Sequence, residues 1–338
     1  MMKKRSFIFL LIGLLLLGFT VGCQEKQDPL PEESSKELKK VTVVLDWVPN
    51  TNHTGLYVAK DNGYYREEGL EVEIIQPTEG AGAEFVAAKQ GDFGISYQEQ
   101  VTYARTADSP LPIKAIAAII QNNTSGYASP AYRNIESPKD FESKRYGGWG
   151  SPMEEQLLQA LMEKEEADFS KLEILNIGAA DFFTSVEKDV DFSLIFYGWD
   201  GVAAESKNMD LNFIKLQELD PDLNFYTPVI VANEELLNED PGLAKKFLNA
   251  TSKGYEYAID NPEKAALCLL DNVPELDKEL VIASQKYLAK EYRADAPRWG
   301  EMKEEIWENY SKWMRERNLI EGQFEAKQAF TNEFLPEK

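Results

Sequence analysis

The sequence predicts an α/β fold in which helices cover mixed β-sheets. The chain has 338 residues, enough for about two domains that each bury a core of their own. Beyond residue 40, short apolar runs alternate with amphipathic stretches, which is the pattern of strands and the helices that cover them. Gly63 and Gly91 stand where two of the predicted helices need a left-handed residue at their end.

The first forty residues predict an export signal followed by a tether. Basic residues precede an apolar run over 7–21, which is shorter than the roughly 20 residues that span a bilayer. The run ends in Thr20-Val21-Gly22-Cys23, which resembles the bacterial lipoprotein cleavage box. We therefore predict a signal peptide over 1–22 and lipidation of Cys23, with ordinary signal cleavage beside a stray cysteine as the alternative. Residues 23–40 have hardly any apolar side chains to bury and are predicted to be a flexible tether.

Four strands are predicted in the first part of the remaining chain. Their apolar runs cover 41–46, 71–76, 93–96 and 113–120. Helices over 53–62 and 83–90 lie between them and end at the two glycines. The polar residues 121–126, which follow the fourth strand, are a candidate hinge.

A second α/β unit is predicted after Gly126. Its strands cover 145–148, 172–176 and 192–196. A helix that runs to residue 164 begins after Ser151, because this serine, the proline that follows it and Glu154 form a capping box. Two pairs of acids are neighbours only in the sequence, and we interpret them as capping and solvated residues: Glu154 and Glu155, and Asp189 and Asp191. A strand over 225–233 returns through a second hinge, and the chain is mostly helical from residue 234 onward.

The composition disfavours several classes of function. Acidic residues outnumber basic ones by 58 to 36, for a formal charge of −22, so a nucleic acid would meet net repulsion. One histidine and two cysteines cannot supply a histidine- or cysteine-rich metal cluster, which leaves a carboxylate site for a hard cation as the alternative. We therefore expect no nucleic-acid partner, no metal and no cofactor.

Aromatic and polar residues stand directly after the ends of several successive predicted strands. In open α/β sheets, ligands bind beyond the carboxyl ends of the strands. Flat rings can sandwich a planar heterocycle while amides and carboxylates form hydrogen bonds with its edge. The candidate ligand-binding residues are Trp47, Asn50, His53, Tyr97, Glu99, Asn122, Trp149, Tyr197, Trp199 and Asp200.

Each of these side chains also has a structural interpretation. A tryptophan taken alone is more often part of a core than a ligand contact. Asp200 precedes a predicted helix, where the helix dipole favours an acidic residue. His53 precedes an apolar helix and is as well explained by hydrogen bonds to the backbone. The recurrence of such residues at successive strand ends is what favours a ligand site.

Three strings of the sequence, Trp47 to Ala59, Gly63 to Tyr65 and Gly91 to Gln98, resemble the NMT1/THI5-like family of solute-binding proteins and thiamin-pyrimidine synthases. The resemblance runs from about residue 41 to 262. It implies a type II periplasmic-binding-protein fold with two hinge crossings and a ligand cleft between two lobes. Lobe 1 is expected over 41–122 and 228–338, and lobe 2 over 123–227. By resemblance, Asn50, His53 and Tyr97 line the first lobe's side of the cleft.

Within this family the chain most resembles the lipoproteins that deliver a formylaminopyrimidine to an ABC transporter. The resemblance implies an extracytoplasmic protein, lipid-anchored to the bacterial cell membrane. It would capture N-formyl-4-amino-5-aminomethyl-2-methylpyrimidine, or a close analogue, and present it to an ABC permease for thiamin salvage. Trp199 and Asp200 would recognise the pyrimidine. We expect a monomer without enzymatic activity.

Two alternatives remain open at this stage. A synthase of the family would need a lysine for pyridoxal phosphate near the third strand and a cysteine-rich run. Residues 93–98 contain no lysine, and the region of Tyr197 contains no cysteine. A binding protein for another solute, such as a sulfonate, would call for arginine or for helix N-termini that hold an anion. The candidate residues include two acids and no arginine.

Overall fold

The computed structural model describes residues 37–77, 82–178 and 180–337. The predicted signal peptide, the lipidation site Cys23 and most of the predicted tether lie outside the described residues. Within the described part of the chain, no helix combines the length and the apolar character needed to cross a bilayer.

One sheet of five strands has the order β2-β1-β3-β10-β4. β1 pairs in parallel with β2 and β3, and β10 runs antiparallel between β3 and β4. β1 begins two residues inside the predicted tether, because Lys39 and Lys40 pair with the first residues of β2. The strands are β1 (Lys39–Val44), β2 (Leu70–Ile75), β3 (Phe93–Ser96), β4 (Ile113–Ala118) and β10 (Val229–Asn233).

A second sheet of five strands has the equivalent order, β7-β6-β8-β5-β9. β6 pairs in parallel with β7 and β8, and β5 runs antiparallel between β8 and β9. The sequence did not predict β5 or β9. β5 reads Ser-Gly-Tyr-Ala-Ser-Pro, a composition typical of a hinge, yet every residue in it is buried between its two partners. The strands are β5 (Ser125–Pro130), β6 (Arg145–Gly148), β7 (Glu173–Asn176), β8 (Phe192–Phe196) and β9 (Leu211–Lys215).

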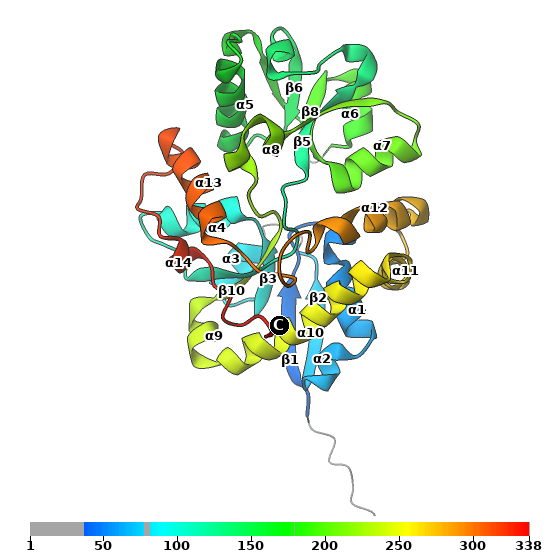
Figure 1. The fold of residues 1–338 in the computed structure, drawn as a ribbon, viewed down its shortest axis with the longest axis vertical. Helices are drawn as coiled ribbons and strands as arrows, with labels where there is room; N and C mark the ends of the chain where they lie inside the picture. Colours follow the sequence, from blue (N-terminus) through cyan, green and yellow to red (C-terminus); the bar gives the residue numbers. More distant parts are fainter. Residues whose placement is uncertain (1–36, 78–81, 179, 338) are drawn as a thin grey trace, which may run out of the picture. The chain divides into compact units, whose positions relative to one another are not determined.

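The two sheets confirm the predicted α/β class with two similarly built lobes. In each sheet, the antiparallel strand is the first one formed after the chain crosses from the other sheet, because β5 follows β4 and β10 follows β9. Helices flank both sheets (Figure 1). With the first sheet lie α1 (Thr54–Asp61), α2 (Tyr64–Glu67), α3 (Gly82–Ala87), α4 (Gln98–Thr106), α9 (Glu234–Glu239), α10 (Pro241–Asp260), α11 (Pro262–Asn272) and α14 (Ala326–Ala329). With the second lie α5 (Pro152–Lys164), α6 (Phe182–Lys188), α7 (Val202–Ser206) and α8 (Leu216–Leu219).

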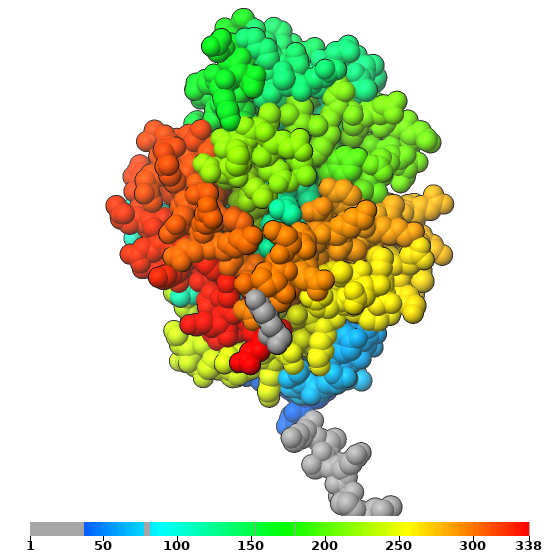
Figure 2. Space-filling view, in the orientation of Figure 1, coloured from blue at the N-terminus to red at the C-terminus, as the bar shows by residue number. Residues whose placement is uncertain are grey.

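Two helices from the predicted lobe 1 also pack on residues of the predicted lobe 2. α12 (Lys278–Glu291) contacts α7, and its surface adjoins that of the second lobe in the space-filling view (Figure 2). Ser284 Oγ donates a hydrogen bond to the carbonyl oxygen of Gly198. α13 (Glu304–Glu316) places Tyr310 and Trp313 in the apolar core of the second sheet. The ring of Tyr310 stacks on Phe225 with a centroid separation of 4.2 Å. The C-terminal helices therefore connect the two sheets in addition to the two chain crossings.

Candidate functional site

Three adjoining cavities lie where residues from the two sheets meet, and Trp47 lines all three. We call them together the cleft. Their volumes are about 330, 190 and 80 Å³. The largest is lined from the first sheet's side by Asp46, Tyr97 and Glu99, and from the second sheet's side by Trp149 and Glu154.

The cleft forms at the carboxyl ends of parallel strands in both sheets. Asp46 and Trp47 follow β1, and Tyr97 follows β3. Trp149 follows β6, while the last residue of β8, Phe196, also lines the cleft. This position agrees with the expectation that side chains beyond successive strand ends converge.

Two side chains of the first lobe hold the carboxylate of Asp46 at the edge of the cleft. Its carboxylate accepts hydrogen bonds from His53 Nε2 at 2.7 Å and from the Tyr97 hydroxyl at 2.6 Å. Burial by itself would raise the pKa of Asp46, but the interactions with His53 and Tyr97 outweigh burial and lower the pKa below its usual value. The backbone N–H of Asn50 donates to His53 Nδ1, so the imidazole proton that faces Asp46 lies on Nε2. Asp46 is thus held as a carboxylate beside the cleft.

Seven of the ten sequence-predicted residues line the cleft. Trp47 and Trp149 are each a little under half exposed, at 46% and 44%, so their rings are available to a ligand. The other five are Asn50, Tyr97, Glu99, Trp199 and Asp200.

The remaining three predicted residues do not line any of the three cavities. His53 is fully buried and acts on the cleft through Asp46. The Asn122 side chain accepts a hydrogen bond from Asn224, which joins the two crossing segments. The Tyr197 hydroxyl donates to Glu205, and its ring packs against Phe213. Each of these side chains already forms a hydrogen bond with another residue of the protein.

Trp199 and Asp200 sit in a single π-helical turn, Tyr197–Gly201, between β8 and α7. Such turns occur often at functional sites because they displace side chains from the regular helical positions. Burial, followed by the nearby charge of Asp181, raises the pKa of Asp200 to about 6. Trp199 also packs against the apolar cluster around α11, so its indole has a structural role as well.

Sequence reasoning missed two acids of the cleft. Asp46 was assigned to the end of the first strand, but the strand ends at Val44 and leaves Asp46 beyond it. Glu154 forms the predicted capping box with Ser151, yet it is only 4% exposed rather than solvated. Its carboxylate accepts from the Tyr146 hydroxyl at 2.7 Å and from the backbone of Trp149 at 3.0 Å. Asp191, also predicted to be solvated, is buried and paired with Arg133.

The described side chains that line the cleft include several acids and no cationic group. None of the described residues that line its three cavities is lysine, arginine or histidine. An anionic ligand would therefore meet repulsion from the acids, with no cation to offset it. The arrangement suits a neutral or cationic ligand that donates hydrogen bonds to carboxylates.

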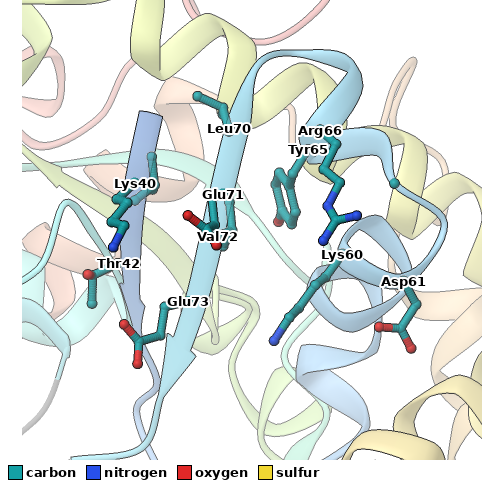
Figure 3. Close-up of a pocket in the computed structure, with 12 residues that line it drawn as sticks. Lys40, Thr42, Lys60, Asp61, Tyr65, Arg66, Leu70, Glu71, Val72 and Glu73 are labelled. Carbon is teal, nitrogen blue, oxygen red and sulfur yellow. The ribbon is translucent and has the colours of Figure 1, made fainter. Parts of the chain in front are cut away.

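A larger hollow of about 610 Å³ lies elsewhere, beside the edge strand β2 (Figure 3). Charged side chains of both signs surround it, among them Lys60, Arg66 and Glu73. The hydroxyl of Tyr65, the one aromatic residue that lines it, already forms a hydrogen bond with Thr251. This hollow lacks the exposed rings and the strand-end position that mark the cleft.

A family comparison agrees with the sequence strings named above. The model of the family described as NMT1/THI5 like matches residues 50–265, more than half of the chain. The chain belongs to the NMT1/THI5-like family. The match covers every strand of the two sheets except β1, and it includes residues on both sides of the cleft.

Two curated proteins show how varied the relatives of this NMT1/THI5-like chain are. A formylaminopyrimidine-binding protein from Halalkalibacterium halodurans is 27% identical, covering 98% of this chain and 99% of that protein. A 4-amino-5-hydroxymethyl-2-methylpyrimidine phosphate synthase from Legionella pneumophila is 24% identical, covering 88% of this chain and 93% of the synthase.

The fold itself matches solved periplasmic binding proteins. The aliphatic sulphonate binding protein SsuA from Escherichia coli superposes with a TM-score of 0.68, at 14% identity, covering 89% of this chain and 94% of that one. This likeness confirms the predicted periplasmic-binding-protein fold and, at such low identity, indicates nothing about the ligand.

Proposed function

We propose that this protein is an extracytoplasmic solute-binding lipoprotein that captures a 4-amino-2-methylpyrimidine, such as the formylaminopyrimidine precursor of thiamin, and delivers it to an ABC permease. The single observation that carries the proposal is the cleft's composition: half-exposed indoles from both sheets beside carboxylates, with no cationic side chain among the described lining residues. Such a site favours a flat, nitrogen-rich ring over an anion. The similarity to a formylaminopyrimidine-binding protein supports this choice of ligand.

Capture would proceed by closure of the two lobes around the ring. Trp47 belongs to the first lobe and Trp149 to the second, so a bound ring that contacts both favours the closed arrangement over the open one. Asp200 would accept a hydrogen bond from an amino or ring N–H group, worth about 1.5–3 kcal/mol for a charged acceptor. The closed form would then be the one that the permease recognises.

The synthase alternative fits the cleft less well. Synthases of the family hold pyridoxal phosphate on a lysine, and no described residue that lines the cleft is a lysine. The acids that face the cavity would also repel the cofactor's phosphate. We therefore expect no Schiff-base absorbance when pyridoxal phosphate is added to the protein.

Calorimetry with four compounds tests the proposal. The formylaminopyrimidine and the hydroxymethylpyrimidine should bind with micromolar affinity or better, whereas taurine should not bind; thiamin tests whether a larger group is tolerated at the 5-position. Asp200→Asn should weaken pyrimidine binding about tenfold or more. Asp189→Asn, at an exposed position of the same lobe, is the matched control. Tight taurine binding without pyrimidine binding would overturn the proposal.

A further inference from the structure

The largest cavity of the cleft contains an acid that has no hydrogen-bond or ion-pair partner among the described residues. Asp46, Glu99 and Glu154 all line this cavity. The carboxylates of Asp46 and Glu154 accept hydrogen bonds from neighbouring side chains and backbone. In the described chain, no residue donates a hydrogen bond to the Glu99 carboxylate or forms an ion pair with it. Glu99 is partly buried, and its carboxylate opens on the cavity, so a ligand there could supply the donor that the described chain does not.

The two glutamates line the same cavity from opposite lobes. Glu99 lies in the first turn of α4, and Glu154 lies in the first turn of α5. Burial, followed by the charge of Glu154, raises the pKa of Glu99 to about 7. The other titratable groups near Glu99 are the hydroxyls of Tyr97, Tyr103 and Tyr310 and the carboxylate of Asp46, which lines the same cavity. None of these groups can supply a positive charge.

We propose that Glu99 and Glu154 form a subsite for a protonated amine, so that the cleft prefers a pyrimidine with an aminomethyl group at its 5-position over the same ring with an uncharged substituent. An ammonium group between the two carboxylates would replace their repulsion with two attractive contacts and would give Glu99 the donor that it lacks. This inference rests on the proposed function, since it assumes that the ring itself is a pyrimidine. It goes further by naming the charge of the ligand's side arm and the residues that select it.

Calorimetry with three pyrimidines of one ring tests the subsite. The compounds share the 4-amino-2-methylpyrimidine ring and carry an aminomethyl, a hydroxymethyl or a formylaminomethyl group. At about pH 8, the aminomethyl compound should bind about tenfold or more tightly than the hydroxymethyl and formylaminomethyl compounds, because their side arms are uncharged. This preference should shrink at about pH 6, because Glu99 then holds a proton while an alkylammonium ligand remains charged.

Three variants make the test specific. Glu99→Gln breaks no hydrogen bond of the described chain, so it should fold normally, abolish most of the preference and remove its dependence on pH. Glu154→Gln should also reduce the preference. Glu155→Gln changes the neighbouring exposed acid and should leave the preference intact. Equal binding of the amine and the alcohol, or an unchanged preference in Glu99→Gln, would overturn the subsite alone. If none of the three pyrimidines binds, both the subsite and the proposed function are wrong.

Discussion

At the scale of single residues, the protein lowers the pKa of one acid of the cleft and raises the pKa of two others. Asp46 is stabilised in its charged form by His53 and Tyr97, and burial of His53 keeps that arrangement rigid. Glu99 and Asp200 have less support, and burial raises the pKa of each, to about 7 and about 6. Asp46 is thus already ionised before a ligand binds. The other two acids would lose their remaining protons when a ligand donates a hydrogen bond or brings a positive charge.

The exposed indoles are expected to contribute to affinity rather than to stability. Trp47→Ala and Trp149→Ala should each weaken pyrimidine binding about tenfold, because each removes a ring face from the cleft. Their apo melting temperatures should change little, since both side chains are nearly half exposed. Tyr132, which is 68% exposed and lines none of the three cavities, provides a matched aromatic control. Calorimetry and thermal unfolding measure both effects, and an unchanged affinity in both tryptophan variants would place the ring elsewhere.

At the scale of elements, close packing of α1 on α10 positions the first lobe's side of the cleft. Gly55 of α1 and Gly254 of α10 are both buried where the two helices meet. Two tyrosine hydroxyls form hydrogen bonds with the backbone of the turn that precedes α1. Tyr255 donates to the carbonyl of Asn52 at 2.7 Å, and Tyr292 donates to the carbonyl of Thr51 at 2.6 Å. This turn ends in His53, which forms the hydrogen bond with Asp46. The packing of α1 on α10 therefore helps to position Asp46.

A methyl group at this helix contact should therefore destabilise the protein. The Cβ of Gly254→Ala would collide with the carbonyl oxygen of Gly55, and a backbone atom in a buried helix cannot move aside easily. We expect a loss of about 1–3 kcal/mol in the free energy of unfolding. Gly242→Ala lies in the same helix but meets only Asp240 Oδ1 at an ordinary 3.5 Å, so it should be nearly neutral. Urea unfolding compares the two variants, and equal midpoints would show that the helices can separate without cost.

At the scale of the whole molecule, the acids of the cleft add to a chain that is already strongly acidic, with a formal charge of −22. The folded apo protein keeps Glu99 and Asp200 protonated to a higher pH than the unfolded chain does, because their folded pKa values of about 7 and about 6 exceed the ordinary 4.5 and 3.8. The stability that these protons contribute is complete below the unfolded values and is lost as the pH rises through 6 and 7. A bound cation or donor would restore part of it.

The apo protein should therefore lose stability between about pH 5 and about pH 8 because of these two acids. We expect the loss to be about 1–3 kcal/mol larger in the unaltered protein than in a Glu99→Gln/Asp200→Asn double variant. Denaturant unfolding at the two pH values measures the difference. Asp46 does not contribute in this window, since its folded pKa is lowered and its effect lies at acidic pH. Parallel pH profiles for the two proteins would contradict the assignment.

Local patterns predicted much of the fold because they report local physics. The strands 93–96, 145–148 and 192–196 and the capped helix that begins after Ser151 agree with the structure residue for residue. Each has an apolar run or a cap that needs no distant partner to be recognised. β5 was missed because its Gly, Ser and Pro residues favour a turn, and only pairing on both sides makes it a central strand.

By itself, the sequence determined the α/β class, the strand ends that carry aromatic and acidic groups, and the acidic charge that disfavours nucleic acids. Tertiary structure decided which of those groups share one cavity. The side chains of His53, Asn122 and Tyr197 bind partners within the protein and do not line the cleft. Asp46 and Glu154, which were not predicted as site residues, do line it. The physical reason is that the residues which follow a strand can be read from the local sequence. Burial and pairing depend on distant residues: Glu99 and Glu154 are more than fifty positions apart, and they line one cavity only when the chain has folded.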